Sequence, residues 1–118
     1  MKSFFYKNYY FIFILLIFII SMNACVYGEN NAETYLKRGK VALDKGEFYL
    51  AVQNFTKSLE IDPNIAEAYF GRSLVWRMTG EIDQALDDVN KGIKLDSSKA
   101  FSHILRGEIY LEKKEYRL

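Results

Sequence analysis

The chain has 118 residues and a formal net charge of +1 at pH 7, which allows one small domain and argues against a strongly basic nucleic-acid binder. Its charges are unevenly distributed. Residues 1–24 contain Lys2 and Lys7 as their only charged side chains, whereas every acidic residue lies beyond Cys25, so the two parts of the chain have different roles.

Residues 1–24 are typical of a targeting segment. Lys2 and Lys7 precede an uncharged run whose fully apolar part, Phe11–Ile20, has the length of a signal-peptide core and is short for a membrane span. Because positive charge on the amino-terminal flank stays in the cytoplasm, we expect the rest of the chain on the far side of the membrane. A signal peptide and an uncleaved anchor both remain open. A buried helix is disfavoured, since a small domain cannot cover a helix that is apolar on all sides.

Cys25 is the only cysteine and directly follows this segment. The sequence Met22-Asn23-Ala24-Cys25 resembles a bacterial lipoprotein signal, in which the residue after the cleavage point is a cysteine that receives lipid. Ala24 fits that pattern, whereas Met22 and Asn23 depart from it. We therefore predict lipidation at Cys25, and an uncleaved anchor or ordinary cleavage, for instance after Gly28, are the alternatives.

From Ala32 onward, after a short linker at residues 25–31, the chain repeats itself with a period of about 34 residues. Units 32–65 and 66–99 are identical at ten of 34 positions without gaps, and residues 100–118 repeat the first half of the unit. Three positions coincide in all three units: Ala32, Ala66 and Ala100; Arg38, Arg72 and Arg106; Glu47, Glu81 and Glu115. A fixed period of this size indicates stacked helical hairpins.

Each full unit is predicted to form two helices, because apolar and small residues recur at three- and four-residue steps. In the first unit, Lys45-Gly46-Glu47 separates the helices and Asp62-Pro63-Asn64 ends the second one. In the second unit, the corresponding breaks are Thr79-Gly80-Glu81 and Asp96-Ser97-Ser98. There a serine replaces the proline, and we expect Ser97 or Ser98 to cap the next helix.

These features resemble the tetratricopeptide-repeat (TPR) family. Its pattern of aromatic, small and proline positions is matched here by Tyr35, Tyr69, Gly39, Gly107, Trp76, Tyr110, Ala51, Ala85 and Pro63. The chain departs from the pattern at Ala42 and His103, where aromatic residues are usual. The resemblance implies an all-α fold: a leader helix, two repeats (32–65 and 66–99) and the first helix of a third (100–118), forming a right-handed solenoid fragment of five antiparallel helices.

No set of side chains in the sequence indicates catalysis, a cofactor or a metal site. His103 is the only histidine and takes an aromatic position, which favours a packing role, and one cysteine with one histidine cannot form a zinc site. We expect Asp87 and Asp88 on a solvated helix face. The repeated arginines are either a row of anion-binding groups or, more simply, stems packed along a helix with their heads in water.

The resemblance also implies a concave groove, lined by the first helix of each unit, that binds a protein or peptide. The groove positions carried over to this chain are Leu36, Lys40, Phe70, Leu74, Arg77, Met78, Phe101 and Ile104. Some of these apolar residues are also expected to cover the core. Chaperone-binding TPR domains hold a partner's carboxylate at positions that are here Leu36, Lys40, Gly71, Phe101 and Leu105. Only Lys40 is basic, so we expect no carboxylate clamp.

We therefore expect a non-catalytic interaction module, a scaffold or adaptor displayed at the bacterial cell envelope. The leader or a lipid would anchor it, its body would lie outside the cytoplasm, and no nucleic acid would be a partner. A secreted or periplasmic form is the alternative location. The second hypothesis is a structural protein that self-associates or stacks through its incomplete third repeat, because an unpaired last helix leaves apolar surface exposed.

Overall fold

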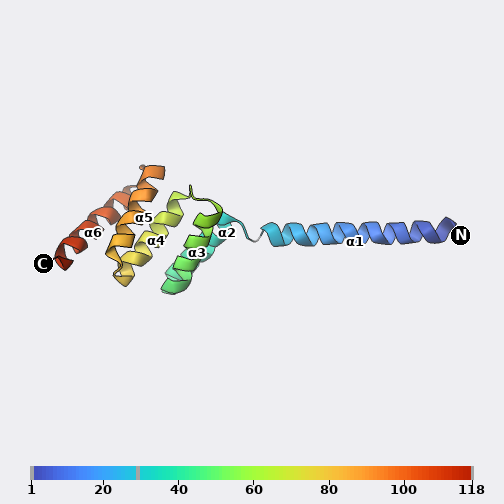
Figure 1. The fold of residues 1–118 in the computed structure, drawn as a ribbon, viewed down its shortest axis with the longest axis horizontal. Coiled ribbons are helices and arrows are strands. Elements are labelled where there is room, and N and C mark those ends of the chain that lie inside the picture. Colours follow the sequence, from blue (N-terminus) through green and yellow to red (C-terminus); the bar gives the residue numbers. More distant parts are fainter. Residues whose placement is uncertain (1, 29, 118) are drawn as a thin grey trace. The chain divides into compact units, whose positions relative to one another are not determined.

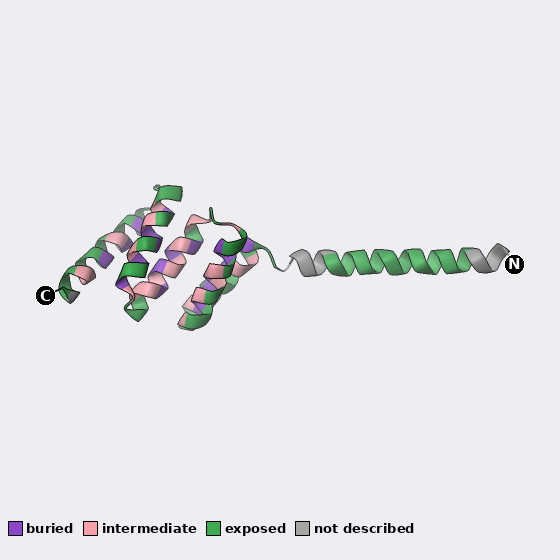
Figure 2. Ribbon diagram, in the orientation of Figure 1, coloured by how far each residue is buried: buried purple, intermediate pink, exposed green. Residues whose placement is uncertain are grey.

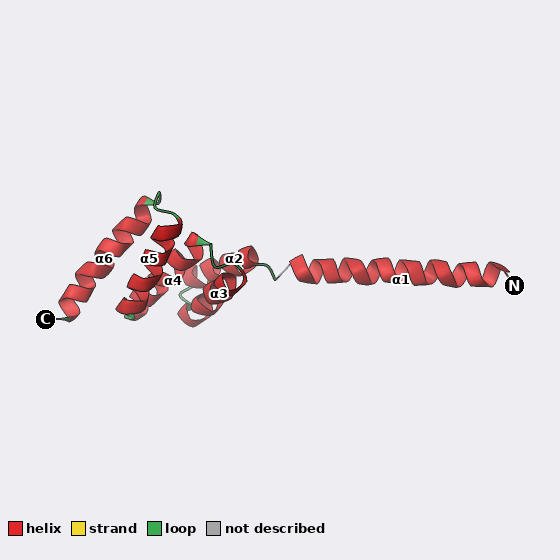
Figure 3. Cartoon of the chain, turned by 45° about the horizontal axis from the view of Figure 1, so that its top comes forward, coloured by secondary structure: helices red, strands yellow, loops and turns green. Residues whose placement is uncertain are grey.

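The computed structural model describes residues 2–28 and 30–117, and every regular element in them is a helix (Figures 1 and 3). The elements are α1 (Lys2–Gly28), α2 (Ala32–Asp44), α3 (Phe48–Ile61), α4 (Ala66–Thr79), α5 (Ile82–Leu95) and α6 (Ala100–Tyr116). The all-α prediction, with one leading apolar helix and five further helices, is confirmed. The chain divides into two units, residues 1–31 and residues 32–118.

The segment Tyr6–Asn23 of helix α1 is long and apolar enough to cross a membrane, a test that signal sequences also pass. All side chains of this segment are exposed (Figure 2). Ser21 and Asn23 donate hydrogen bonds to the carbonyl oxygens of Ile17 and Ile19, at 2.7 and 2.8 Å. These bonds satisfy the polar groups within the helix, as an apolar environment requires.

Residues 32–118 contain two helical hairpins, α2–α3 and α4–α5, and α6 packs against α5. Each hairpin turns at a glycine with positive φ, 73° at Gly46 and 89° at Gly80, which side chains with a Cβ rarely adopt. The turns close with equivalent hydrogen bonds: the Glu47 N–H donates to the Ala42 carbonyl, and the Glu81 N–H donates to the Trp76 carbonyl. The glycines recur one repeat apart because the turn recurs.

The connections between units share an aspartate turn. The carboxylate of Asp62 accepts the backbone N–H of Asn64, and that of Asp96 accepts the backbone N–H of Ser98, both at 2.9 Å. The prediction that Ser97 or Ser98 caps α6 is wrong. Lys99 is the N-cap, and its side chain cannot accept a cap hydrogen bond. The Ser98 hydroxyl donates to Asp96 instead, at 2.6 Å.

Two aromatic rings pack against glycines where the helices of the body approach closely. A Cβ added at Gly39 or Gly71 would lie 2.7 or 2.4 Å from the ring of Phe55, and one added at Gly92 would lie 2.3 Å from the ring of Phe70. Around these contacts the core forms two clusters. The first contains Leu36, Ala42, Ala51, Phe55, Leu59, Ala68 and Val75, and the second contains Phe70, Ile82, Ala85, Val89, Leu105 and Ile109.

Small buried residues also hydrogen-bond within the hairpins, in positions where larger side chains have no room. The Ser73 hydroxyl donates to the Ala85 carbonyl at 2.7 Å, and the Ser58 hydroxyl donates to the Ala32 carbonyl at 2.8 Å. All four residues are buried. The bond between Ser73 and Ala85 joins α4 to α5 where two small residues meet.

A buried ion pair connects α3, α4 and α5. The Arg72 guanidinium donates to both carboxylate oxygens of Asp88, at 2.7 and 2.8 Å, and to the Thr56 hydroxyl at 3.0 Å. The Trp76 indole N–H also donates to Asp88, at 3.1 Å. The hydrogen bond to Asp88 raises the pKa of Arg72. The expectations of a solvated Asp88 and an arginine head in water are therefore wrong here, because each group is the other's partner.

The glycine–aromatic contacts predict opposite effects for two Gly→Ala substitutions in helices. Gly71→Ala should lower the free energy of unfolding by about 1–3 kcal/mol, because its methyl group overlaps the Phe55 ring. Gly107→Ala, which meets open space in α6, should raise it by roughly 0.5–1 kcal/mol through helix propensity. Urea unfolding of the full chain in detergent, followed by Trp76 fluorescence, measures both. Equal effects of the two substitutions would contradict the packing account.

The buried ion pair predicts strong coupling between Arg72 and Asp88. Asp88→Ala should lower the free energy of unfolding by about 3–5 kcal/mol, because it leaves a largely buried guanidinium without its carboxylate. Adding Arg72→Met should recover much of that loss, since no uncompensated charge then remains. A double-mutant cycle measured by urea unfolding checks this, and additive effects of the two substitutions would show that the pair is not coupled.

Candidate functional site

The first helices of the three units form one continuous surface, since α2 packs against α4 and α4 packs against α6. Ion pairs connect each neighbouring pair of helices along this surface. Lys40 of α2 contacts Glu67 of α4 at 2.7 Å. Arg77 of α4 contacts Glu112 of α6 at 2.8 Å and also contacts Glu108. We call this surface of α2, α4 and α6 the groove.

The groove contains a pocket of about 240 Å³ between α2, α4 and α6. Phe55 and Phe70 line it with buried rings, whose exposed fractions are 0% and 5%. Gly71 also lines the pocket, and the Phe55 ring packs against it. Phe101, which is 53% exposed, lies at the edge of the pocket. The remaining lining residues are Leu43 and the charged Lys40, Glu67 and Lys99.

Three of the predicted groove residues, Lys40, Phe70 and Phe101, therefore line one pocket. Leu74 is half-buried against the second core cluster. Leu36 is only 2% exposed and lies in the first cluster, so it belongs to the core and we leave it out of the contact surface. The family resemblance placed Leu36 among the groove positions, but neighbouring helices cover its side chain.

The other predicted residues lie outside the pocket, further along α4 and α6. The Arg77 head is held between Glu108 and Glu112, and the hydrogen bond to Glu112 raises its pKa. Met78 and Ile104 are 55% and 61% exposed. This stretch offers apolar contact area beside an arginine whose charge is already paired.

Besides Phe55 of α3, sequence reasoning missed the lining residue Lys99. It lies in the connection before α6, and first-helix periodicity cannot identify a residue outside a helix. Gly71, another lining residue, occupies a carboxylate-binding position of chaperone-binding TPR domains. At the other such positions Leu36 and Leu105 are buried, so Lys40 is the only one of the five that presents a charge.

Other predicted features lie away from the groove pocket. His103 is exposed, and its Nε2 is 2.8 Å from the Ser97 carbonyl oxygen, so it is a surface residue rather than a packed one. Within the described residues, no group of three histidine, cysteine, aspartate or glutamate side chains could hold a metal ion. The side chain of Cys25 lies outside the described part of the structure, so its lipidation stays a prediction.

Helix α6 has an apolar outer surface. Tyr110 and Leu111 are 52% and 67% exposed, and a Cβ added at Gly107 would meet nothing within 4 Å. At the equivalent position in α4, Ser73 is fully buried against α5. Self-association through this surface stays a prediction.

Comparisons with known proteins match residues 32–65 to the model of a family described as tetratricopeptide repeat. The chain is 28% identical over 99 residues to DnaJ homolog subfamily C member 7 from Homo sapiens, covering 79% of this chain but only 20% of that protein. A crystal structure of MamA is 28% identical, has a TM-score of 0.71, and aligns over 81% of this chain and 56% of that chain. The TPR2B domain of yeast Sti1, in a complex with pHsp70, is 26% identical with a TM-score of 0.68, over 73% of this chain and 69% of that chain.

Proposed function

Since the chain carries a tetratricopeptide-repeat domain, we propose that it is a non-catalytic scaffold that binds a segment of a protein partner in its groove. The pocket between α2, α4 and α6 is the observation that carries this proposal. Its apolar interior is open to solvent, and its lining comes from all three first helices. The complex of the Sti1 domain with pHsp70 supports it, because that domain has a similar fold.

The pocket suggests what the bound segment looks like. Its volume and its aromatic lining suit one large apolar side chain inserted between Phe70 and Phe101. Lys40 is already paired with Glu67, whereas Lys99 has no ion pair among the described residues. The segment therefore carries an apolar anchor with an acidic group close to it, which would pair with Lys99. This recognition does not require a terminal carboxylate.

Phe101→Asp tests the groove. Phe101 is 53% exposed, so the substitution should leave the fold intact, while it places a charge at the edge of the apolar pocket. We expect affinity for the bound protein segment to fall by about tenfold or more. The full chain is used to capture partners by crosslinking in native membranes, and the affinity of the captured segment is then measured for each variant.

Tyr49→Asp is the matched control for this test. Tyr49 is also an exposed aromatic residue, but it lies on α3 and does not line the groove pocket. Circular dichroism confirms that both variants fold. If Phe101→Asp binds as tightly as Tyr49→Asp, the binding site is not in the groove.

We extend the proposal to the bacterial cell envelope. Helix α1 has a span-length apolar segment, and the only charged residues before the end of that segment are basic, Lys2 and Lys7. This pattern supports an amino terminus in the cytoplasm and a body on the outer side of the membrane. Cys25 would then carry the lipid that anchors the body after cleavage, so that the scaffold works next to a membrane.

Mass spectrometry of the mature amino terminus tests this arrangement. We expect the mature chain to begin at a lipid-modified Cys25, and Cys25→Ser to abolish processing because the thiol is the acceptor. Met22→Leu is the control variant, since it brings the segment closer to the lipoprotein pattern and should preserve processing. An unmodified chain beginning at Glu29, or one that retains Met1, would exclude lipidation at Cys25.

A further inference from the structure

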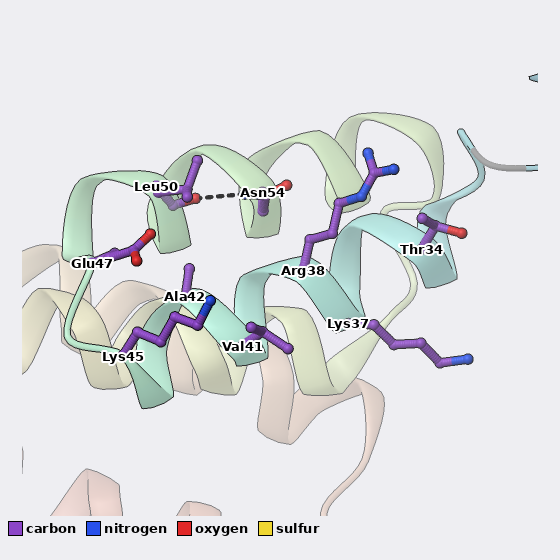
Figure 4. Close-up of a pocket in the computed structure, with 9 residues that line it drawn as sticks. All are labelled: Thr34, Lys37, Arg38, Val41, Ala42, Lys45, Glu47, Leu50 and Asn54. Carbon is purple, nitrogen blue, oxygen red and sulfur yellow. Dashed lines mark hydrogen bonds between the residues drawn. The ribbon is translucent and has the colours of Figure 1, made fainter.

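A second pocket, of about 560 Å³, lies on the first hairpin and is lined only by α2, α3 and the turn between them. Figure 4 shows Arg38, Val41 and Lys45 on one side of it and Leu50 and Asn54 of α3 on the other. We call the surface formed by these five residues the end face. Val41 and Leu50 are 51% and 43% exposed, so the end face contains accessible apolar surface.

The internal repeat shows what covers such a surface elsewhere in the chain. Val41 and Val75 occupy the same position in successive repeats, yet Val41 is half-exposed and Val75 is fully buried. The difference arises because α3 packs against α4, with Phe48 and Val52 lying beside Val75. In the second repeat, α3 covers this surface of α4. The end face is the equivalent surface of the first repeat, on α2.

The repeated arginine shows the same relationship. Arg72 donates a hydrogen bond to Thr56 of α3 at 3.0 Å, and Arg106 donates one to Asn90 of α5 at 3.4 Å. Thr56 and Asn90 are themselves one repeat apart, so each arginine binds the same position of the preceding helix. Arg38 makes the same ring contact as Arg72: its guanidinium lies 5.5 Å from the centroid of the Tyr35 ring, and that of Arg72 lies 5.9 Å from the centroid of the Tyr69 ring.

These two covering helices define a common binding pattern. On its covering face, helix α3 has two apolar residues four positions apart and a polar residue four positions further on. Helix α5 has the same pattern. The residues are Phe48, Val52 and Thr56 in α3, and Ile82, Leu86 and Asn90 in α5. Residues at four-residue steps lie on one helix face. A helix with this pattern fits the end face in the same way.

The charge of the end face narrows the choice of partner. Asp88 neutralises Arg72 within the second hairpin. In the first hairpin, the uncharged Asn54 occupies the position that Asp88 has in the second, so it cannot neutralise Arg38. The amide of Asn54 donates to the Leu50 carbonyl at 2.8 Å, as the dashed line in Figure 4 shows. Lys37 and Lys45 add positive charges to the lining of this pocket and Glu47 adds a negative one, so the lining keeps a positive net charge. An acidic residue at the polar position of the partner would therefore complement Arg38.

We propose that the end face binds an amphipathic helix of a protein partner, with two apolar residues four apart and an aspartate or glutamate four residues further on. The apolar residues pack on Val41 and Leu50, and the carboxylate accepts hydrogen bonds from Arg38. This site uses none of the residues that line the groove pocket. The proposal is therefore independent of the proposed groove function.

A synthetic helix derived from the chain's own α3 is the probe. It contains residues 47–62 with Thr56→Asp and is stapled on its solvent-facing side, because a free peptide of this length is barely helical. Its dissociation constant for the full chain in detergent is measured by titration calorimetry. We expect saturable binding, which a probe with an additional Val52→Asp substitution loses.

Two variants of the chain locate the probe. Val41→Asp should weaken binding at least about tenfold, and Arg38→Gln should weaken the Asp-containing probe more than the unsubstituted Thr56 probe. The groove variant Phe101→Asp should leave binding unchanged. Val41 and Arg38 are both exposed, so these variants should fold.

Three results would overturn the proposal. The first is absence of binding, and the second is binding that Phe101→Asp weakens and Val41→Asp does not. The third is a wild-type oligomer that Val41→Asp converts to a monomer in light scattering, which would identify a second copy of the chain as the occupant.

Discussion

The packing of the Phe55 ring between Gly39 and Gly71 is the contact on which the body of the molecule depends. It joins α2, α3 and α4 at distances that exclude even a methyl group from either glycine. The Phe70 ring packs in the same way against Gly92 of α5. Because both rings also line the groove pocket, the contacts that set the helix spacing create the apolar surface of the candidate site as well.

The ion pairs divide into two kinds with different physical consequences. The Arg72–Asp88 pair is almost enclosed and is shared by Thr56 and Trp76, so it specifies how α3, α4 and α5 fit together. Lys40–Glu67 lies in the solvent, where such pairs contribute little to stability. A ligand can therefore rearrange the charged rim of the groove at small cost while the buried pair preserves the scaffold.

The groove and the end face have different origins in the repeat. The groove is formed by first helices of successive units, and it needs several units to exist. The end face is a surface that every unit has, but in the later units a preceding helix covers it. Since the two surfaces share no lining residues, a scaffold of this kind has room for two partners at once.

The sequence by itself determined the helices, the turns and the apolar character of α1, because periodicity, Gly46, Gly80 and Pro63 act locally. The family resemblance that the repeat carries predicted Lys40, Phe70 and Phe101 as groove residues, and the structure brings these three into one pocket. Only the tertiary structure decided what covers each helix face. Neighbouring helices bury Leu36. Asp88 pairs with Arg72, which lies 16 residues earlier in the chain. Lys99 lines the groove pocket although it lies in a connection between helices. Periodicity reports which residues share a face, but burial and charge pairing depend on the element packed against it.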